Sequence, residues 1–502
     1  MNTPPQSVDQ IEAHPQRWVG LAVILIAAFM NLIDVTIVNV ALPRLQAGFG
    51  ATSSQIEWVV AAYVLAFALG LLPFGRLGDA VGRKRMFLIG ITAFTVFSAI
   101  CGMAPSMNAL IVARIFQGFA SAMMMPQVLA IAQLMFPPHE RGFAFSFFGL
   151  SAGLASVAGP LVGGLLISAD LWGLDWRPIF LVNIPIGIFA IFAGRALIPD
   201  LPSHPDLKHD IGGIVIAGVS IVLLVFPLIE GHALDWPWWT FAMIAASFVG
   251  LGCFYLYERR QERRGASELL PVSLLRNRNF LIGVAMATLF FSGMAGFFLI
   301  LAVFLQTGFG FSALQSGLTT VPFPVGVLLA SLVTGRLGGR WPRRRVAVGS
   351  IIVAGGMAFL KLRVGEVGDA VDHWQFMPPL LISGFGMGIG ISSLFQTVLA
   401  NVPPRDAGAG AGALQSFQQI GSALGIAISG QIFFTRLAEM FATGHAQHAA
   451  FVAGLDDALI YEIAAFAVVA VMVFLLSKPQ PGEAGAGHAP HGGEKPPVPV
   501  EL

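Results

Sequence analysis

The sequence predicts an all-α integral membrane protein with about fourteen transmembrane helices. Of its 502 residues, 56% are apolar and only 11% are charged, whereas soluble proteins are about 25% charged. Apolar runs of about 20 residues recur along the chain, and each is long enough to cross about 30 Å of hydrocarbon. These two observations place the chain in a lipid bilayer.

The apolar runs set the approximate limits of the spans, because each must match the thickness of the hydrocarbon layer. The predicted spans are 18–42, 56–75, 85–104, 107–128, 143–167, 179–197, 211–230, 238–257, 279–305, 313–335, 345–361, 376–400, 407–434 and 458–477.

Positive charges gather in alternate loops. With the N-terminus in the cytoplasm, roughly 22 of the 28 Lys and Arg residues fall in inner loops and tails and roughly 5 in outer loops. This bias predicts a multi-pass protein with both termini cytoplasmic, and a bacterial inner membrane is the expected location. The net charge is +1 and the basic residues are spread over short loops, so no nucleic-acid partner is expected. Cys101 and Cys253 lie in separate apolar runs and suggest neither a disulfide nor a metal site.

Asp34 lies inside the first span, among apolar and weakly polar neighbours. A carboxylate at the centre of a lipid-spanning helix costs about 2.5–3.5 kcal/mol on insertion scales. Such a residue normally faces a protein interior or a wet cavity, where it is paired or takes up a proton. Asp34 is therefore the first candidate for a functional carboxyl group.

Span four supplies a partner for Asp34 in Arg114, followed one turn later by Gln117. Arg114 is expected about 10 Å from the outer end of its helix, at the same depth as Asp34. An ion pair or a water-bridged pair is then geometrically possible. The alternative is that Arg114 extends to the membrane surface, but Gln117 on the same face favours the pair.

Two further carboxyl groups lie in or near spans. Glu57 opens span two and could be functional, but Ser54 and Glu57 also fit a helix-capping box, which we favour. Glu462 lies in the last span and could be a second proton site. Its expected place near the outer end of that span favours an interfacial position.

The inner loop between spans two and three combines glycines with charges. The glycines allow a tight reversal between helices, and Asp79 and Arg83 can pair across it. The run resembles the signature loop of the major facilitator superfamily, where it acts as a conformational switch. It matches at Gly75, Leu77, Asp79, Gly82, Arg83 and Lys84.

A weaker copy of this loop at 335–340 has Gly339 where the first has Asp79. The repeat indicates a duplicated six-span unit with two spans inserted between the copies. This plan resembles the fourteen-span drug:proton antiporter branch of the superfamily. The expected segments are a cytoplasmic tail (1–17), an N-terminal six-helix bundle (18–197), two inserted helices with a cytoplasmic linker (198–278), a C-terminal six-helix bundle (279–477) and a disordered cytoplasmic tail (478–502).

Span five contains Gly159, Pro160, Gly163 and Gly164. Small residues at this spacing promote close helix packing in any membrane protein, and Pro160 bends the helix. The combination also resembles the antiporter motif of drug exporters, although Ala155 stands where that motif usually has glycine. Both interpretations predict a close helix contact at span five.

Several glutamines lie within spans, where an amide that faces lipid is costly. We therefore expect them to face the interior, as candidates for a substrate cavity. The candidates are Gln117, Gln306, Gln396 and Gln418.

The resemblance implies a secondary exporter of amphipathic or drug-like molecules that exchanges them for protons by alternating access. In the family, the Arg114 and Gln117 motif is associated with proton coupling. No phosphate-binding loop is present, so the expected energy source is a proton gradient without a cofactor. The expected partners are a small-molecule substrate, protons and the bilayer, with a periplasmic adaptor protein as a further candidate.

Two alternatives remain at this point. A proton-coupled importer of a metabolite would use the same fold. A membrane-embedded enzyme or sensor is the other, but no cluster of His, Cys or Ser suggests a nucleophile. We therefore expect a transporter and no catalytic residue.

Overall fold

The computed structural model describes residues 15–136, 138–200, 210–231, 234–266, 268–337, 341–367, 371–399, 402 and 407–476. Within these ranges the chain forms helices joined by turns, without a strand. The predicted all-α class is confirmed. The C-terminal tail 478–502 and residues 1–14 of the N-terminal tail lie outside the described residues.

The first part of the chain forms a bundle of long helices joined by short turns. These elements are α1 (Arg17–Phe49), α2 (Ser53–Val81), α3 (Arg83–Gly102), α4 (Met107–Met135), α5 (Pro138–Ser168), the short η1 (Leu171–Gly173), α6 (Pro178–Leu181) and α7 (Asn183–Leu197). Two long helices follow, α8 (Ile211–Glu230) and α9 (Trp238–Arg263).

The rest of the chain forms a second set of helices. These are α10 (Val272–Arg276), α11 (Arg278–Val303), the π-helical turn η2 (Phe304–Gly308), α12 (Ala313–Thr320), α13 (Pro322–Leu337), α14 (Pro342–Gly365), α15 (His373–Leu399), α16 (Ala407–Ala442), α17 (Gln447–Met472) and η4 (Val473–Leu475).

Thirteen helices in the described ranges are long and apolar enough to cross a membrane. Two of these spans are interrupted, one between α6 and α7 and one between α12 and α13. The remaining predicted span corresponds to α5, whose described apolar stretch, Val157–Ser168, is shorter. The chain is a multi-pass membrane protein.

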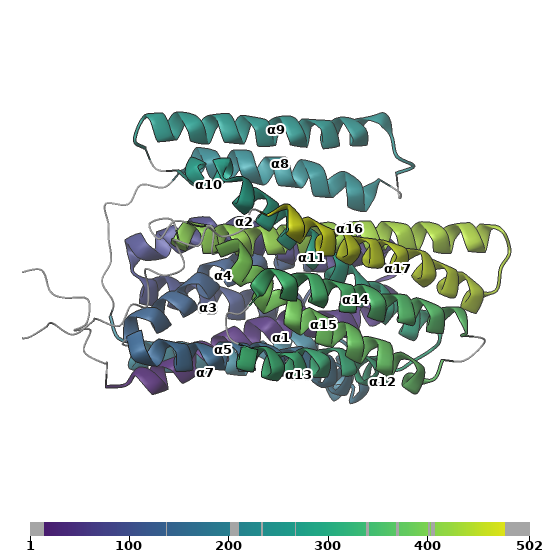
Figure 1. The fold of residues 1–502 in the computed structure, drawn as a ribbon. Coiled ribbons are helices and arrows are strands. Elements are labelled where there is room, and N and C mark those ends of the chain that lie inside the picture. The colour runs from purple at the N-terminus through teal and green to yellow at the C-terminus, as the bar shows by residue number, and fades with distance from the viewer. Residues whose placement is uncertain are drawn as a thin grey trace, which may run out of the picture.

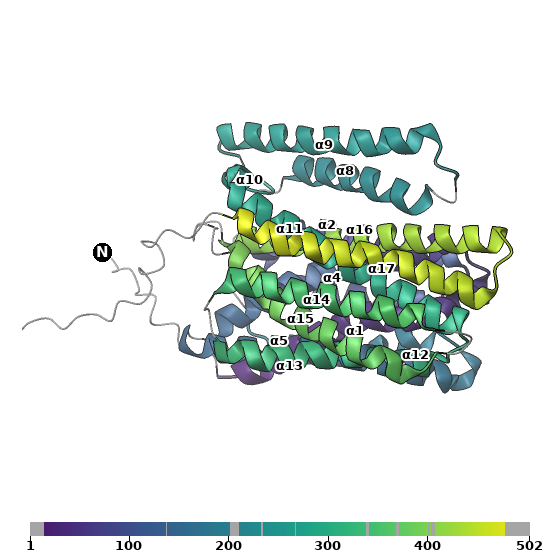
Figure 2. The ribbon, with the colours of Figure 1, turned by 45° about the vertical axis from the view of Figure 1, so that its right-hand side comes forward.

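The long helices lie roughly parallel, as Figures 1 and 2 show. The described chain begins and ends at the same end of the bundle, called here the terminal end. The turn between α16 and α17 lies at the opposite end, called here the far end. In both views α8 and α9 form a separate pair on one side of the bundle. Helices α8 and α9 therefore lie at the periphery.

Polar contacts fix the ends of this peripheral pair. Asp210 caps α8, since its Oδ1 accepts a hydrogen bond from the backbone N–H of Gly213 at 2.9 Å. Tyr257 of α9 donates its hydroxyl to the same oxygen at 2.9 Å. At the other end of α8, Trp58 of α2 donates its indole N–H to Glu230 at 2.8 Å. The pair is thereby attached to the bundle through α2.

Two sequence predictions about carboxyl groups are wrong. The capping box of α2 is made by Thr52 and Gln55, so Glu57 is free of that role and is buried, with 3% of its surface exposed. Helix α17 begins at Gln447 rather than near 458, which places Glu462 in the middle of the helix, fully buried. The start of α17 was missed because Gln447, His448, Asp456 and Asp457 interrupt its apolar residues.

Helix α5 joins the first bundle (α1–α7) to the second set of helices (α10–α17), called here the two halves of the protein, through its glycines. Gly159 and Gly163 lie directly against α1, where an added Cβ would meet Thr36 and Ile37. Gly164 lies against α12, where a Cβ would be 2.7 Å from the Cα of Leu314. Small residues let helix backbones approach this closely. The predicted close contact of span five is present, and it extends to the second half of the chain.

A leucine at Gly159 tests this contact. Gly159→Leu forces a large side chain between α5 and α1, and overpacking of this kind costs about 1–3 kcal/mol. We expect a clear fall in the melting temperature of the purified protein. Gly355→Leu is the matched control, because Gly355 lies within α14 with nothing within 4 Å of an added Cβ. Equal melting temperatures for the two variants would contradict the close packing of α5.

Candidate functional site

Asp34 and Arg114 form a salt bridge in the interior of the first bundle. Asp34 lies on α1 and Arg114 on α4, and their side chains expose 0% and 1% of their surfaces. The distance from Nη1 of Arg114 to Oδ2 of Asp34 is 2.6 Å. The structure therefore brings together the two residues whose equal depth predicted a pair.

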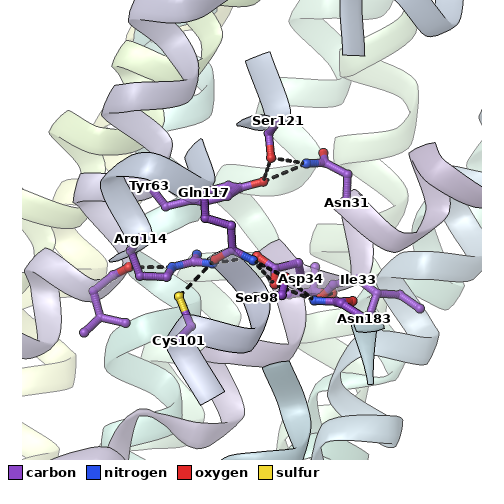
Figure 3. A network of polar contacts seen from close by, with 12 residues as sticks. Asn31, Ile33, Asp34, Tyr63, Ser98, Cys101, Arg114, Gln117, Ser121 and Asn183 are labelled. Carbon is purple, nitrogen blue, oxygen red and sulfur yellow. Dashed lines mark hydrogen bonds and ion pairs between the residues drawn. The ribbon is translucent and has the colours of Figure 1, made fainter. Parts of the chain in front are cut away.

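The second oxygen of Asp34 is bound by two amides (Figure 3). Gln117 of α4 donates its Nε2 to Oδ1 at 2.9 Å. Asn183, the first residue of α7, donates its Nδ2 to the same oxygen at 3.0 Å. Both carboxylate oxygens thus have donors, which is the condition under which a buried ionised group is tolerated.

Arg114 is held on its other sides as well. Its Nε donates to the backbone carbonyl of Val59 on α2 at 3.1 Å, and its Nη1 donates to Oε1 of Gln117 at 2.8 Å. The guanidinium carbon lies 4.0 Å from the centre of the Tyr63 ring, a favourable cation–π arrangement. The side chain cannot reach the membrane surface in this conformation.

An outer layer of polar groups orients the two amides. Ser98 of α3 accepts hydrogen bonds from Gln117 at 2.9 Å and from Asn183 at 3.3 Å. Cys101, one turn along α3, donates its thiol to Oε1 of Gln117 at 3.5 Å. Four helices of the first bundle, α1, α3, α4 and α7, therefore contribute side chains to one network.

A neighbouring cluster on α1, α2 and α4 makes no hydrogen bond to Asp34. Asn31 donates its Nδ2 to the hydroxyls of Tyr63 and Ser121, each at 2.7 Å, and the two hydroxyls lie 2.7 Å apart (Figure 3). Because Tyr63 also faces Arg114 with its ring, this cluster adjoins the salt bridge.

Two local features of the chain place these groups. A Cβ on Gly118 would meet the backbone of Tyr63, so α4 approaches α2 closely and Arg114 reaches the carbonyl of Val59. The sixth span breaks at Val182, where Pro185 lacks the N–H that would bond to the carbonyl four residues earlier. The break puts Asn183 at a helix start.

A cavity of about 120 Å³ lies near this network, between the two halves. Thr36 and Asn39 of α1 line one side, and Phe298 of α11 and Phe323 of α13 line the other. Pro160 of α5 also lines the cavity. Asp34 is on the same helix as Thr36 and Asn39, so the network and the cavity share α1.

The four candidate glutamines do not gather at this cavity. Gln117 is fully buried in the Asp34 network. Gln306 donates its Nε2 to the carbonyl of Val40 at 2.9 Å, a contact between α1 and η2. Gln396 is exposed, and Gln418 is partly exposed on α16. As a group they are not cavity residues in this structure.

The signature loop is more helical than its glycines predict. Helix α2 runs to Val81, so Gly75 lies within it, and Gly82, with φ of 108°, makes the turn. Arg83 donates to the carbonyl of Ala130 on α4 at 3.4 Å. The side chain of Asp79 lies outside what the structure describes, so its pairing with Arg83 stays a prediction.

Sequence reasoning missed the two positioning residues Asn183 and Ser98. The available signal was an amide inside an apolar span two residues before a proline. A buried amide needs partners. Pro185 breaks the helix here, and the break lets the Asn183 amide reach partners on other helices.

The energetics of the pair can be tested by a double-mutant cycle. Arg114→Met leaves the Asp34 carboxylate buried without its cation, and breaking a buried pair costs about 3–5 kcal/mol. Adding Asp34→Asn removes that charge, so we expect the double variant to recover most of the lost thermal stability in detergent. Additive losses in the double variant would show that the two residues do not interact.

Three comparisons identify the relatives of this chain. A family model described as the Major Facilitator Superfamily matches residues 24–213 and 210–426. The probable actinorhodin transporter of Streptomyces coelicolor is 40% identical over 422 residues, covering 84% of this chain and 73% of that protein. The tetracenomycin C resistance and export protein of Streptomyces glaucescens is 29% identical over 433 residues, covering 84% and 77%.

A solved structure shows the same fold. A bacterial homologue of the human lysosomal transporter Spinster, in an inward-facing and occupied conformation, aligns with a TM-score of 0.65 at 16% identity. The alignment covers 92% of this chain and 97% of that one. The chain belongs to the major facilitator superfamily and is a membrane transporter of small molecules rather than an enzyme.

Proposed function

We propose that the chain is a secondary exporter of amphipathic, drug-like molecules that exchanges them for protons by alternating access. The observation that carries this proposal is the fully buried pair of Asp34 and Arg114. A membrane protein that retains a buried carboxylate normally uses it for an ion or proton pathway.

The network offers two states of Asp34 with different partners. Ionised Asp34 is held by Arg114, Gln117 and Asn183. A proton on Asp34 removes its negative charge and weakens its attraction for Arg114. The side chains of α1, α4 and α7 can then rearrange together, which is how protonation would change the packing of the first bundle.

The shared helix α1 is the proposed link between proton and substrate. Thr36 and Asn39 line the cavity and follow Asp34 on α1 by two and five residues. Movement of α1 on protonation would therefore alter the cavity wall. The apolar side chains Phe298 and Phe323 on the opposite wall suit a substrate held by shape and apolar contact.

The proposed orientation places the terminal end in the cytoplasm of a bacterial cell, following the positive charges of the loops. The far end is closed in this structure by the contact of Gln306 with Val40 and by Gly164 against Leu314. The cavity would then open next toward the cytoplasm, the side from which an exporter takes its substrate.

The energy source in this proposal is the proton gradient, without a bound cofactor. One charge moved across 100 mV is worth about 2.3 kcal/mol, which supports a substrate concentration ratio of about 50-fold. The names of two relatives, one an actinorhodin transporter and one a tetracenomycin C export protein, support organic small molecules as substrates. A periplasmic adaptor is a further proposed partner.

Everted membrane vesicles test the direction and the coupling. With an imposed proton gradient, we expect vesicles with the protein to accumulate ethidium or a neutral amphipathic dye. Asp34→Asn keeps a similar shape and can still accept a hydrogen bond from Arg114, but it cannot cycle a proton. Its accumulation ratio should fall to about that of vesicles without the protein, at normal expression.

Asp456→Asn is the matched control, because Asp456 forms a partly exposed pair with Lys361 far from the network. Gradient-driven accumulation that persists in Asp34→Asn would overturn the assignment of Asp34. Accumulation only in right-side-out vesicles would instead identify an importer.

A further inference from the structure

Glu57 lies at a contact between the two halves of the protein. It follows the first turn of α2 at the far end, and 3% of its surface is exposed. Its carboxyl group lies directly against Gly430 of α16, where an added Cβ would be 2.5 Å from Cδ of Glu57. Only a glycine leaves room for the carboxyl group at this place. The burial of Glu57 therefore depends on the approach of α16.

No cation of the described helices pairs with Glu57. Helix α2 packs against α1, α3, α4, α8 and α16, and α3 carries no charged residue toward the far end. The charged residues that the other helices carry toward the far end are Arg44, Asp34, Arg114, Glu230, Arg436 and Glu439.

Each of these cations is paired elsewhere or exposed. Arg114 is bound by Asp34, Arg436 pairs with Glu439 and with Asp457, and Arg44 is exposed. The neighbouring carboxylate is that of Glu230, which accepts a hydrogen bond from Trp58, the residue next to Glu57, and it repels a second negative charge.

These surroundings decide the protonation state of Glu57 when the far end is closed. An ionised carboxylate that is buried without a cation is strongly disfavoured, and the Oε2 atom of Glu57 has no hydrogen-bond partner among the described residues. Glu57 therefore carries its proton while α2 and α16 are together. If the halves separate at the far end, water reaches the carboxyl group and it can ionise.

We propose that Glu57 is a second proton-binding site, which takes up a proton from the far side as α2 and α16 close over it. The site is separate from Asp34, which lies within one bundle, whereas Glu57 lies between the two halves. The inference rests on the alternating-access part of the proposed function. The expected pH dependence follows: acid on the far side favours the closed far end, and alkali favours the open one.

Glu462 provides a matched control. It is also fully buried, and its Oε1 accepts a hydrogen bond from Ser429, the residue next to Gly430, at 2.7 Å. It lies between α16 and α17, two helices of the same half. Separation of the halves leaves its surroundings unchanged, so it should not respond to opening of the far end.

The test measures the far-end distance by paired spin labels across a pH series in lipid nanodiscs. Labels are attached through Ala47→Cys on α1 and His445→Cys after α16, both at exposed positions. The background carries Cys253→Ser, because Cys253 is exposed while Cys101 is buried. It also carries Asp34→Asn, so that titration of Asp34 cannot contribute.

In this background we expect the distance to lengthen as the pH rises. Glu57→Gln, a neutral mimic of the protonated form, should abolish the lengthening, and Glu57→Asp, which can still ionise, should retain it. Glu462→Gln should leave the response intact. The inference is overturned if the background shows no pH response, if Glu57→Gln keeps it, or if Glu462→Gln removes it equally. None of these outcomes bears on the vesicle assay with Asp34→Asn, so the two proposals fail independently.

Discussion

The first bundle depends on the burial of one ion pair. Removing two charges from water is expensive, and the cost is offset only if every polar atom of the pair has a partner. Both carboxylate oxygens of Asp34 and the Nε and Nη1 atoms of Arg114 have such partners, and α2, α4 and α7 supply them alongside the pair itself. The break in the sixth span and the close approach of α4 to α2 each deliver a group to the network, Asn183 in one case and the carbonyl of Val59 in the other.

The contacts between the halves are of a different kind. They include close approaches at glycines, as at Gly164 against Leu314 and Gly430 against Glu57. These two contacts can separate without breaking an ion pair. Rigid-body movement of two bundles needs a rigid interior within each bundle and contacts between them that can separate. The hydrogen-bonded network of the first half and the glycine contacts between the halves suit such a movement.

The fold follows from the sequence because bilayer thickness dictates the length of each apolar run. The pairing of Asp34 with Arg114 also follows, since equal depth in two helices leaves few other partners. Asn183 could not be predicted in the same way, because its approach depends on a helix break. Glu57 and Glu462 were misplaced because helix limits were set by hydropathy, whereas Thr52 and Gln447 begin or precede helices with polar residues.

The central claim is that Asp34 exchanges its proton for substrate. The most direct measurement is proton release from the purified protein in weakly buffered detergent, on addition of the dye that the vesicles accumulate. We expect release by the unmodified protein and none by Asp34→Asn, with dye binding retained in both. Equal proton release by the two proteins would show that another group carries the proton.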